Sequence, residues 1–306
     1  MINEHTTEWL GVPVTLFDKA LAKKGVDDYR SRIYRMATEY DGAPFEEIFA
    51  AFTSKAECAQ APAIIIGACS SDGGQEMGGA LELLVAARGK LTGLKGIFFG
   101  DIIVEESELS WIEQADVSPL FSAYPALEHF RVRGGNGLSL GSSPRHDKLK
   151  SLVVETGGLS ADVIREIAGA YLPELENLEI WLGEENYGGD ATLEDVLPLL
   201  EVGRFPKLKR LGICNAEFQD DIAKAVADST VVEQLEVLSL ALGNLSDEGA
   251  EALLGCSAIR RLKHLDLHHH YLSKDMMAQL KAALPSVDLS EAQTGDDDER
   301  YIAHSE

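Results

Sequence analysis

The chain has 306 residues, enough for about two average domains and a sizeable core. Its 45% hydrophobic and 25% charged residues are typical of a folded globular protein and exclude a fibrous or wholly disordered chain. Asp and Glu number 51 against 27 Lys and Arg, so the formal net charge is −24, which disfavours nucleic acid and anionic membrane surfaces as partners.

Residues 1–60 are expected to form an N-terminal α+β cap. The segments VPVTLF and RSRIYRMA are strand-like, and PFEEIFAAFTSKAE is helix-like. Solenoid proteins need such units to cover their exposed end layers. The first residues, MINEHTTEW, lack the pattern of a secretory signal, and no apolar run reaches the roughly 18 residues of a membrane span, so we expect a cytoplasmic protein.

Residues 61–290 contain an internal repeat. The template L-x-x-L-x-L occurs seven times, with start-to-start spacings of 33, 22, 26, 33, 27 and 27 residues, mostly within the range of leucine-rich repeats. A degenerate unit begins at Ala61, and a half unit begins at Val287. The seven matches begin at Leu94, Leu127, Leu149, Leu175, Leu208, Leu235 and Leu262.

Each unit predicts a short strand followed by a loop and a helix. In the strands, alternate residues such as Leu238 and Leu240 face the interior. One unit cannot bury its apolar faces alone, so stacked units predict an α/β leucine-rich-repeat solenoid, a right-handed βα superhelix with a curved parallel sheet. The residues expected to cap the helix N-termini are Ser160, Thr192, Ser246 and Ser273.

Several segments are less generic than the leucine spacing. They are FFGDI from Phe98, SWIEQADVSPL from Ser110, RVRGGNGLSL from Arg131, ETGGL from Glu155, WLGEENYGGDA from Trp181, DLHHHYLS from Asp266 and the terminal RYIAHSE. On these segments the chain resembles, nearly end to end, a family of uncharacterised bacterial leucine-rich-repeat proteins, and LSLALGNLSDEGAEALL resembles a single repeat of the ribonuclease-inhibitor type. The resemblance implies a cytoplasmic protein with no agreed catalytic residue, and some members of that family are encoded beside radical-SAM and ATP-grasp proteins.

The repeats depart from the common pattern at their ninth position, where an Asn or Cys usually bonds the backbone of the turn. No asparagine ladder can form from these residues, the glycines predict tight turns with positive φ, and His270 is expected to replace the missing Asn. The ninth residues are Ile102, Gly135, Gly157, Gly183, Ala216, Gly243 and His270.

Outward-facing residues of neighbouring strands should align in rows across the concave face, because parallel strands lie about 4.8 Å apart. In one row Arg133 is expected beside Glu155, and Glu155 beside Trp181. Trp and Arg are enriched among binding hot spots. The alternative is that Arg133 and Glu155 only pair with each other while Trp181 packs under a loop. The partner-binding residues that we predict are Arg131, Arg133, Glu155, Glu179, Trp181 and Tyr187.

An insertion, GEENYGGDA, follows the strand of the unit that begins at Leu175. Its residues Glu184, Glu185 and Asp190 could bind a cation or a basic partner, because loops at this edge often carry function. A solvated acidic loop without a specific ligand is the favoured interpretation.

The segment DLHHHYL, with His264 upstream, raises the question of a metal site. His264 and His268 lie about 13 Å apart along a strand, at about 3.3 Å per residue, which is too far for one ion. His264 and Asp266 are therefore only weak candidates, the sequence offers no third ligand, and no metal is predicted. The glycine-rich RGGNGLSLG matches no phosphate-binding loop, so no cofactor is expected.

Two further features predict no special chemistry. The cysteines follow neither a zinc-site spacing nor a disulfide framework, so we expect reduced, mostly buried thiols at Cys58, Cys69, Cys214 and Cys256. Residues 291–306 are expected to be an acidic C-terminal segment in which Asp296–Glu299 are solvated.

Together these patterns favour a non-catalytic interaction module that binds a protein or peptide on its concave face and adjoining loops. The acidic balance predicts a basic contact surface on that partner. The alternative is an accessory subunit or metal-dependent enzyme of a peptide or natural-product modification pathway, motivated by the gene neighbourhood of the resembling family and by the His-rich last repeat. The sequence does not indicate an oligomeric state.

Overall fold

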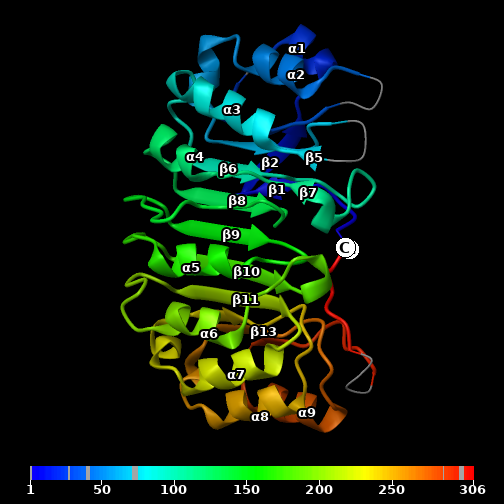
Figure 1. Ribbon diagram of the computed structural model, residues 1–306, viewed down its shortest axis with the longest axis vertical. Helices are drawn as coiled ribbons and strands as arrows, with labels where there is room; N and C mark the ends of the chain where they lie inside the picture. Colours follow the sequence, from blue (N-terminus) through cyan, green and yellow to red (C-terminus); the bar gives the residue numbers. More distant parts are fainter. Residues whose placement is uncertain (1, 27, 39–41, 71–74, 285, 296–299) are drawn as a thin grey trace.

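One curved sheet of twelve strands runs the length of the molecule in the computed structural model (Figure 1). The structure describes residues 2–26, 28–38, 42–70, 75–284, 286–295 and 300–306, so the prediction for Asp296–Glu299 lies outside the described residues. The strands, in spatial order, are β1 Glu8–Trp9, β2 Val12–Leu16, β3 Ile33–Met36, β4 Ala63–Ile66, β6 Gly96–Phe99, β8 His129–Arg133, β9 Ser151–Glu155, β10 Asn177–Gly183, β11 Arg210–Ala216, β12 Val237–Ser239, β13 His264–Asp266 and β14 Val287–Asp288.

The strand pairing follows the leucine repeat. Every L-x-x-L-x-L match forms one strand that begins at its third residue, and equivalent leucines pair across neighbours, as Leu211 pairs with Leu238 and Leu238 with Leu265. All neighbours run parallel except the β1–β2 hairpin, which is antiparallel. A second, two-stranded sheet pairs β5 (Gln75–Glu76) with β7 (Ile112–Glu113). The predicted α/β leucine-rich-repeat solenoid with a parallel sheet is confirmed.

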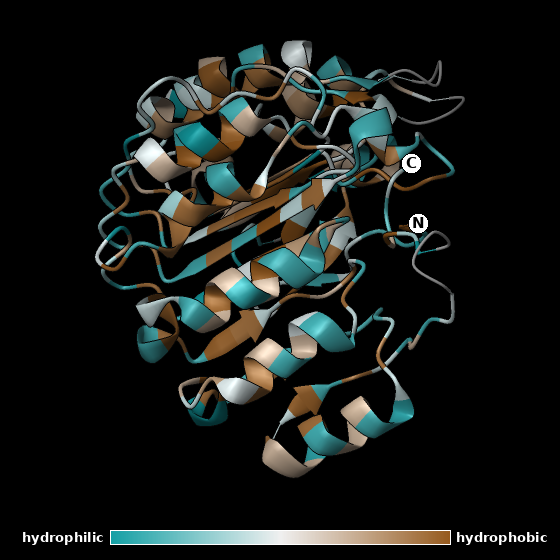
Figure 2. Cartoon of the chain, turned by 60° about the horizontal axis from the view of Figure 1, so that its bottom comes forward, coloured by the Kyte–Doolittle hydropathy of each residue, from teal (hydrophilic) through white to brown (hydrophobic). Residues whose placement is uncertain are grey.

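Helices cover the convex side of the sheet and enclose the main core between the two layers (Figure 2). Their starts follow the predicted caps: the side chains of Ser160, Ser246 and Ser273 each accept a backbone N–H hydrogen bond, and Thr192 forms a capping box with Asp195. The α-helices are α1 Lys19–Lys24, α2 Phe45–Phe52, α3 Gly78–Ala86, α4 Ser118–Ala123, α5 Ala161–Gly169, α6 Leu193–Val196, α7 Gln219–Asp228, α8 Asp247–Gly255 and α9 Lys274–Ala283.

One repeat lacks the expected helix. Residues 134–150, all of which are described, contain no helix between β8 and β9. Successive units begin at Leu127 and Leu149, so this repeat is only 22 residues long. Such a repeat is too short to leave the sheet, form a helix over the core and return to the next strand. The segment instead runs extended and forms isolated bridges, Asp116 with Ser139 and Arg145 with Tyr171.

The N-terminal residues continue the sheet and also cover part of its concave face. β2 and β3 lie within the two strand-like segments and extend the parallel order from β4. The β1–β2 hairpin brings Trp9 over this face, where its ring centroid lies 6.2 Å from that of Phe98. Trp9 packs against a small buried cluster there, made of Ile33, Ala63, Ile65 and Phe98.

The turns after the strands correct the prediction made for the ninth repeat position. Only Gly183 has a positive φ among the ninth-position glycines, at 74°. In other repeats the left-handed residue comes one position earlier, as at Asn215 with a φ of 57°. Gly157 is needed for close packing instead, because a Cβ there would overlap the carbonyl oxygen of Ser305.

His270 bonds the backbone of its turn, as expected for a replacement of the missing Asn. Its Nδ1 accepts a hydrogen bond from the Leu272 N–H at 3.1 Å, and its Nε2 lies 3.2 Å from the Leu289 carbonyl oxygen. Both contacts are with backbone groups of the last repeats, and the His270 side chain is fully buried. No helix in the described part of the chain is long and apolar enough to cross a membrane.

Candidate functional site

A pocket of about 320 Å³ lies on the concave face across β10, β11, β12 and β13. Its walls come from the outward-facing third, fifth and seventh residues of these repeats, because parallel strands in register place equivalent residues side by side. The polar residues of the pocket are Asn177, Glu179, Arg210, Ser239, His264, Asp266, His268 and His304.

Trp181 forms one wall of the pocket together with the C-terminal segment. Its ring stacks on His304, with centroids 5.0 Å apart and planes 8° from parallel, and only 8% of Trp181 is exposed. The backbone of the segment is fixed by hydrogen bonds from the Ala303 N–H to the Leu242 carbonyl at 2.8 Å and from the His304 N–H to Asn215 Oδ1 at 3.0 Å. Residues 300–306 therefore lie over the ends of the central strands (Figure 1).

Glu179 projects into the pocket from β10. It pairs in register with Gly212 of β11, whose missing side chain leaves room for the Glu179 side chain. Trp181 Nε1 donates a hydrogen bond to Glu179 Oε1 at 3.0 Å, and burial raises the pKa of this carboxyl. Within the described residues, Glu179 has no ion pair with Lys, Arg or His.

A polar chain crosses the floor of the pocket from Cys214 to His268. Cys214 Sγ lies 3.3 Å from Ser239 Oγ, Ser239 Oγ donates to Asp266 Oδ2 at 3.0 Å, and His268 Nδ1 donates to Asp266 Oδ1 at 2.8 Å. Burial raises the pKa of Cys214 well above its ordinary value, so its thiol is protonated at neutral pH. The carboxylate stands between the hydroxyl and the imidazole, and this order does not activate Ser239 as a nucleophile.

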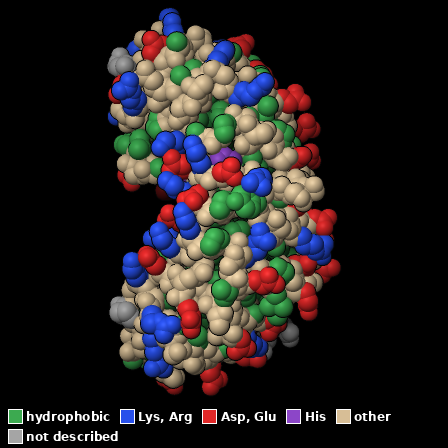
Figure 3. Space-filling view, turned by 90° about the vertical axis from the view of Figure 1, so that its left-hand side faces the viewer, with side chains coloured by type: hydrophobic (Ala, Val, Ile, Leu, Met, Phe, Trp, Pro, Cys, Tyr) green, Lys and Arg blue, Asp and Glu red, His purple; other side chains and the backbone are tan. Residues whose placement is uncertain are grey.

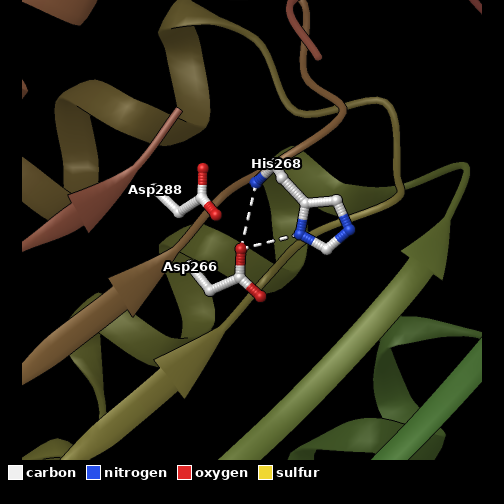
Figure 4. Close-up of side chains that lie close together, drawn as sticks. All are labelled: Asp266, His268 and Asp288. Carbon is white, nitrogen blue, oxygen red and sulfur yellow. Dashed lines mark hydrogen bonds and ion pairs between the residues drawn. The ribbon is translucent and has the colours of Figure 1, made fainter. Parts of the chain in front are cut away.

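His268, Asp266 and Asp288 form a cluster at the last strands (Figure 4). One ligand atom from each residue lies within 4.8 Å of the others, and all three residues are partly exposed. Of the two weak candidates predicted from the sequence, Asp266 belongs to this cluster, and His264 Nδ1 lies 2.8 Å from Ser286 Oγ. Asp288 was missed by the sequence analysis, although the half unit VDLS places it one repeat beyond Asp266, and the two residues pair in register.

The predicted neighbours Arg133 and Glu155 do lie side by side, but they are buried in an ion-pair network. Arg133 Nε donates to Glu155 Oε2 at 2.8 Å, and Arg131 contacts the other oxygen of Glu155. Arg133 and Glu155 are 3% and 2% exposed. Burial opposes ionisation, but the two guanidinium groups outweigh it and lower the pKa of Glu155.

The network continues to the earlier strands, where a second buried carboxylate has its own guanidinium. Arg35 Nε lies 2.8 Å from Asp101 Oδ2, and Arg133 Nη1 lies 3.6 Å from Asp101 Oδ1. Arg133 Nη1 also donates to the Ile102 carbonyl at 2.8 Å. The charges on this part of the concave face thus satisfy one another.

The acidic insertion after β10 is held by local contacts. Tyr187 donates its hydroxyl hydrogen to Glu306 Oε1 at 2.6 Å, and this bond raises the pKa of Tyr187 to about 12. Asp190 Oδ1 accepts a hydrogen bond from the Ala161 N–H at 2.7 Å, at the start of α5. Glu185 is exposed and Glu184 is half-buried. Tyr187 therefore links the insertion to the C-terminal segment.

A charge ladder that the sequence analysis did not identify runs along the N-terminal ends of the strands. The second residue of successive repeats alternates in sign, and Glu128 bonds both neighbouring lysines, Lys95 at 2.7 Å and Lys150 at 2.5 Å. Basic and acidic side chains lie interspersed beside the hollow of the molecule in Figure 3. The ladder consists of Lys95, Glu128, Lys150, Glu176, Lys209, Glu236 and Lys263.

Comparison with known proteins finds solved structures with a similar fold. A crystal structure of a protein from Bacteroides fragilis, a target of the Northeast Structural Genomics Consortium, matches with 34% sequence identity and a TM-score of 0.81, covering 89% of this chain and 76% of that chain. The crystal structure of a TLR13–ssRNA13 complex matches with 13% identity and a TM-score of 0.42, covering 87% of this chain and 43% of that chain. No protein-family model and no curated protein matches the sequence.

Proposed function

The chain belongs to the same family as the Bacteroides fragilis protein, and we propose that it is a non-catalytic binding module for a basic protein or peptide. Its leucine-rich-repeat-like fold suggests an interaction module, since such solenoids present an extended concave surface. In this proposal the concave pocket receives a Lys or Arg side chain of the partner beside Glu179. Trp181 and the adjoining C-terminal segment form the wall against which the partner packs.

The observation that carries the proposal is that Glu179 forms no ion pair with Lys, Arg or His in the described part of the chain. The two buried carboxylates of the earlier strands, Asp101 and Glu155, each contact a guanidinium group. Among the residues that the structure describes, Glu179 accepts a hydrogen bond from the Trp181 indole alone, and it lines a pocket large enough for one basic side chain. A bound guanidinium or ammonium would supply the counter-charge that burial makes favourable.

The net charge supports the same class of partner. At −24 the chain attracts basic surfaces, and this attraction raises association rates and weakens as salt is added. The proposed contact residues are Glu179 and Trp181, with Arg131 on β8 and Tyr187 in the insertion after β10. Arg133 and Glu155 would support this surface from below, because they are buried.

Peptide selection tests the proposal. A random-peptide display library is panned against the immobilised chain at low ionic strength, and we expect enrichment of peptides that carry Lys or Arg. Their affinity should fall about tenfold or more in Glu179→Gln, since a charge-assisted bond contributes on the order of 1.5–3 kcal/mol. The matched control is Glu251→Gln, which makes the same charge change at an exposed site on α8. Failure to enrich basic peptides, or equal binding by the wild type and Glu179→Gln, would contradict the proposal.

A further inference from the structure

We propose that Asp266, His268 and Asp288 bind a divalent transition-metal ion of the zinc class. This inference is independent of the proposed peptide binding. It concerns the last strands of the sheet, and Asp266 lies three strands from Glu179, about 14 Å at about 4.8 Å per strand. The juxtaposition that carries it is an imidazole beside two carboxylates on neighbouring parallel strands (Figure 4).

The solenoid itself brings these donors together. Asp266 is the last residue of β13 and Asp288 the last of β14, and the two pair in register, so their carboxylates project from adjacent strands on the same face. His268 follows Asp266 by two residues, and therefore returns to that face just beyond the strand end. The three ligand atoms lie within 4.8 Å of one another, a separation that small side-chain movements bring to the geometry of one ion.

The charge balance of the cluster supports a cation. Like charges directly opposite each other on paired strands are destabilising. Elsewhere on this sheet Glu128 lies between two lysines, Lys95 and Lys150. In the residues that the structure describes, no Lys or Arg forms an ion pair with Asp266 or Asp288, and His268 is the one titratable cation in contact with them. A divalent ion would neutralise both carboxylates together.

The surroundings hold the carboxylates in place for such an ion. Ser239 Oγ donates to Asp266 Oδ2 at 3.0 Å, and the Ser290 N–H donates to Asp288 Oδ1 at 2.9 Å. Hydrogen bonds of this kind orient the ligands of metal sites. His268 Nδ1 now bonds Asp266 Oδ1 at 2.8 Å, and an ion would replace the proton between these two atoms.

The donor set selects the class of metal. An imidazole ligand favours zinc and neighbouring transition metals over Mg²⁺ and Ca²⁺, which prefer all-oxygen sites. Three protein ligands leave at least one coordination position open, as in zinc sites that bind a water or another ligand. Because Asp266 and His268 line the pocket, this open position would face the concave side.

Metal titration tests the inference. The full chain is purified without a His tag, treated with a chelator and titrated with Zn²⁺ by calorimetry, and Co²⁺ is used as an optical probe of ligand geometry. We expect one ion per chain, with proton release on binding. Affinity should fall at least tenfold in Asp288→Asn and in His268→Gln, two nearly isosteric changes that circular dichroism should show to be folded.

Two control variants separate this site from the other histidines of the last repeat. His264→Gln and His269→Gln should keep the wild-type affinity, because His264 contacts Ser286 and His269 Nε2 lies 3.0 Å from the Tyr301 carbonyl oxygen. The inference is overturned by absence of Zn²⁺ binding at millimolar concentration, by binding that survives Asp288→Asn and His268→Gln, or by equal loss in His264→Gln. Peptide binding in the wild type does not bear on any of these outcomes.

Discussion

The two halves of the concave face use the same strand geometry but handle charge in opposite ways. From β4 to β9 side chains cover the face: Trp9 covers an apolar cluster, and Arg131 and Arg133 lie over the Phe98 ring and bond Glu155. From β10 to β13 the face holds a pocket, and its carboxylates form no ion pair with a guanidinium group within the described ranges. The first half therefore pairs its carboxylates with its own guanidinium groups, whereas the second half has acceptor groups available for a cation.

The pairing of outward-facing side chains decides which rows of the sheet can bind a ligand. A buried carboxylate is costly unless it is paired, so the network of the first half must be complete in the free protein. In the second half Glu179 and Asp266 are only partly buried and keep access to the pocket. Strand register alone does not distinguish a paired row from a row that can bind a ligand, because the residue types at equivalent repeat positions determine the difference.

The sharpest way to test the comparison is to make the same substitution on neighbouring strands. Glu155→Gln removes the shared partner of Arg131 and Arg133, and leaving Arg133 buried without it should lower the free energy of unfolding by about 3–5 kcal/mol. Glu179→Gln removes a carboxyl without an ion pair, so it should change stability by less than about 1 kcal/mol. Urea unfolding at neutral pH measures both values.

Equal losses of stability in the two variants would contradict this contrast between the halves, because they would mean that Glu179 is as fully paired as Glu155. A large loss of stability in Glu179→Gln, with little loss in Glu155→Gln, would reverse the contrast between the two halves. The double variant should lose about the sum of the two changes if the halves act independently, and a difference of more than about 0.5 kcal/mol would show coupling between them.

A second test opens the wall of the pocket. Gly157→Ala places a methyl group where the Ser305 carbonyl oxygen lies, while the backbone φ at this position suits alanine. We expect displacement of residues 300–306, a loss of about 1–3 kcal/mol, and exposure of Trp181 to acrylamide quenching. Gly169→Ala is the control, because a Cβ at Gly169, at the end of α5, meets no neighbour within 4 Å.

The pH dependence of the same wall follows from His304. Burial lowers the pKa of His304 to about 4 from an ordinary value of 6.5. A released segment takes up a proton more readily than a docked one, so docking is complete above about pH 6.5 and weakens as the pH falls toward 4. Trp181 fluorescence should report this change in a chain whose other tryptophans, Trp9 and Trp111, are replaced by Phe.

His304→Phe keeps an aromatic ring on Trp181 but cannot take up a proton. In this variant the fluorescence change between pH 6.5 and pH 4 should disappear. An unchanged transition would show that another group controls the docking of the segment. Glu155 in the paired half should contribute little to this change, because the guanidinium groups of Arg131 and Arg133 hold its pKa below the ordinary value.

The sequence predicted the architecture because each repeat signals its own strand. Leucines at fixed spacing place Leu211, Leu238 and Leu265 in adjacent strands, and serine caps mark the helix starts. The prediction of a helix after β8 was wrong, because it applied a uniform unit to a repeat of only 22 residues. The turn glycines were misjudged because the close approach of Ser305 to Gly157 joins residues far apart in the chain.

Less of the candidate site could be predicted from the sequence. Row alignment correctly placed Arg133 beside Glu155, and the alternative that they pair with each other is what the structure shows for these two side chains. The stacking of His304 on Trp181 depends on how residues 300–306 fold back, and no repeat pattern encodes that path. Asp288 could have been found by extending the rows into the final half unit.

The smallest expected effect concerns the charge ladder, which is common to both halves. Hydrogen bonds from Lys150 and Lys95 lower the pKa of Glu128 to about 2 from 4.5, so its contribution to stability is complete above about pH 4.5 and is lost as the pH falls toward 2. Glu128→Gln should cost about 0.5–1 kcal/mol in dilute buffer and less in about 1 M salt, because the pairs lie at the surface.

Glu236→Gln provides the matched comparison in the second half. Glu236 bonds one lysine, Lys263, at 2.8 Å, whereas Glu128 bonds two. The loss in Glu236→Gln should therefore be smaller than in Glu128→Gln, and urea unfolding at two salt concentrations measures both. If the two losses are equal and independent of salt, the ladder acts through packing rather than charge, and the contrast between the halves is confined to the concave rows.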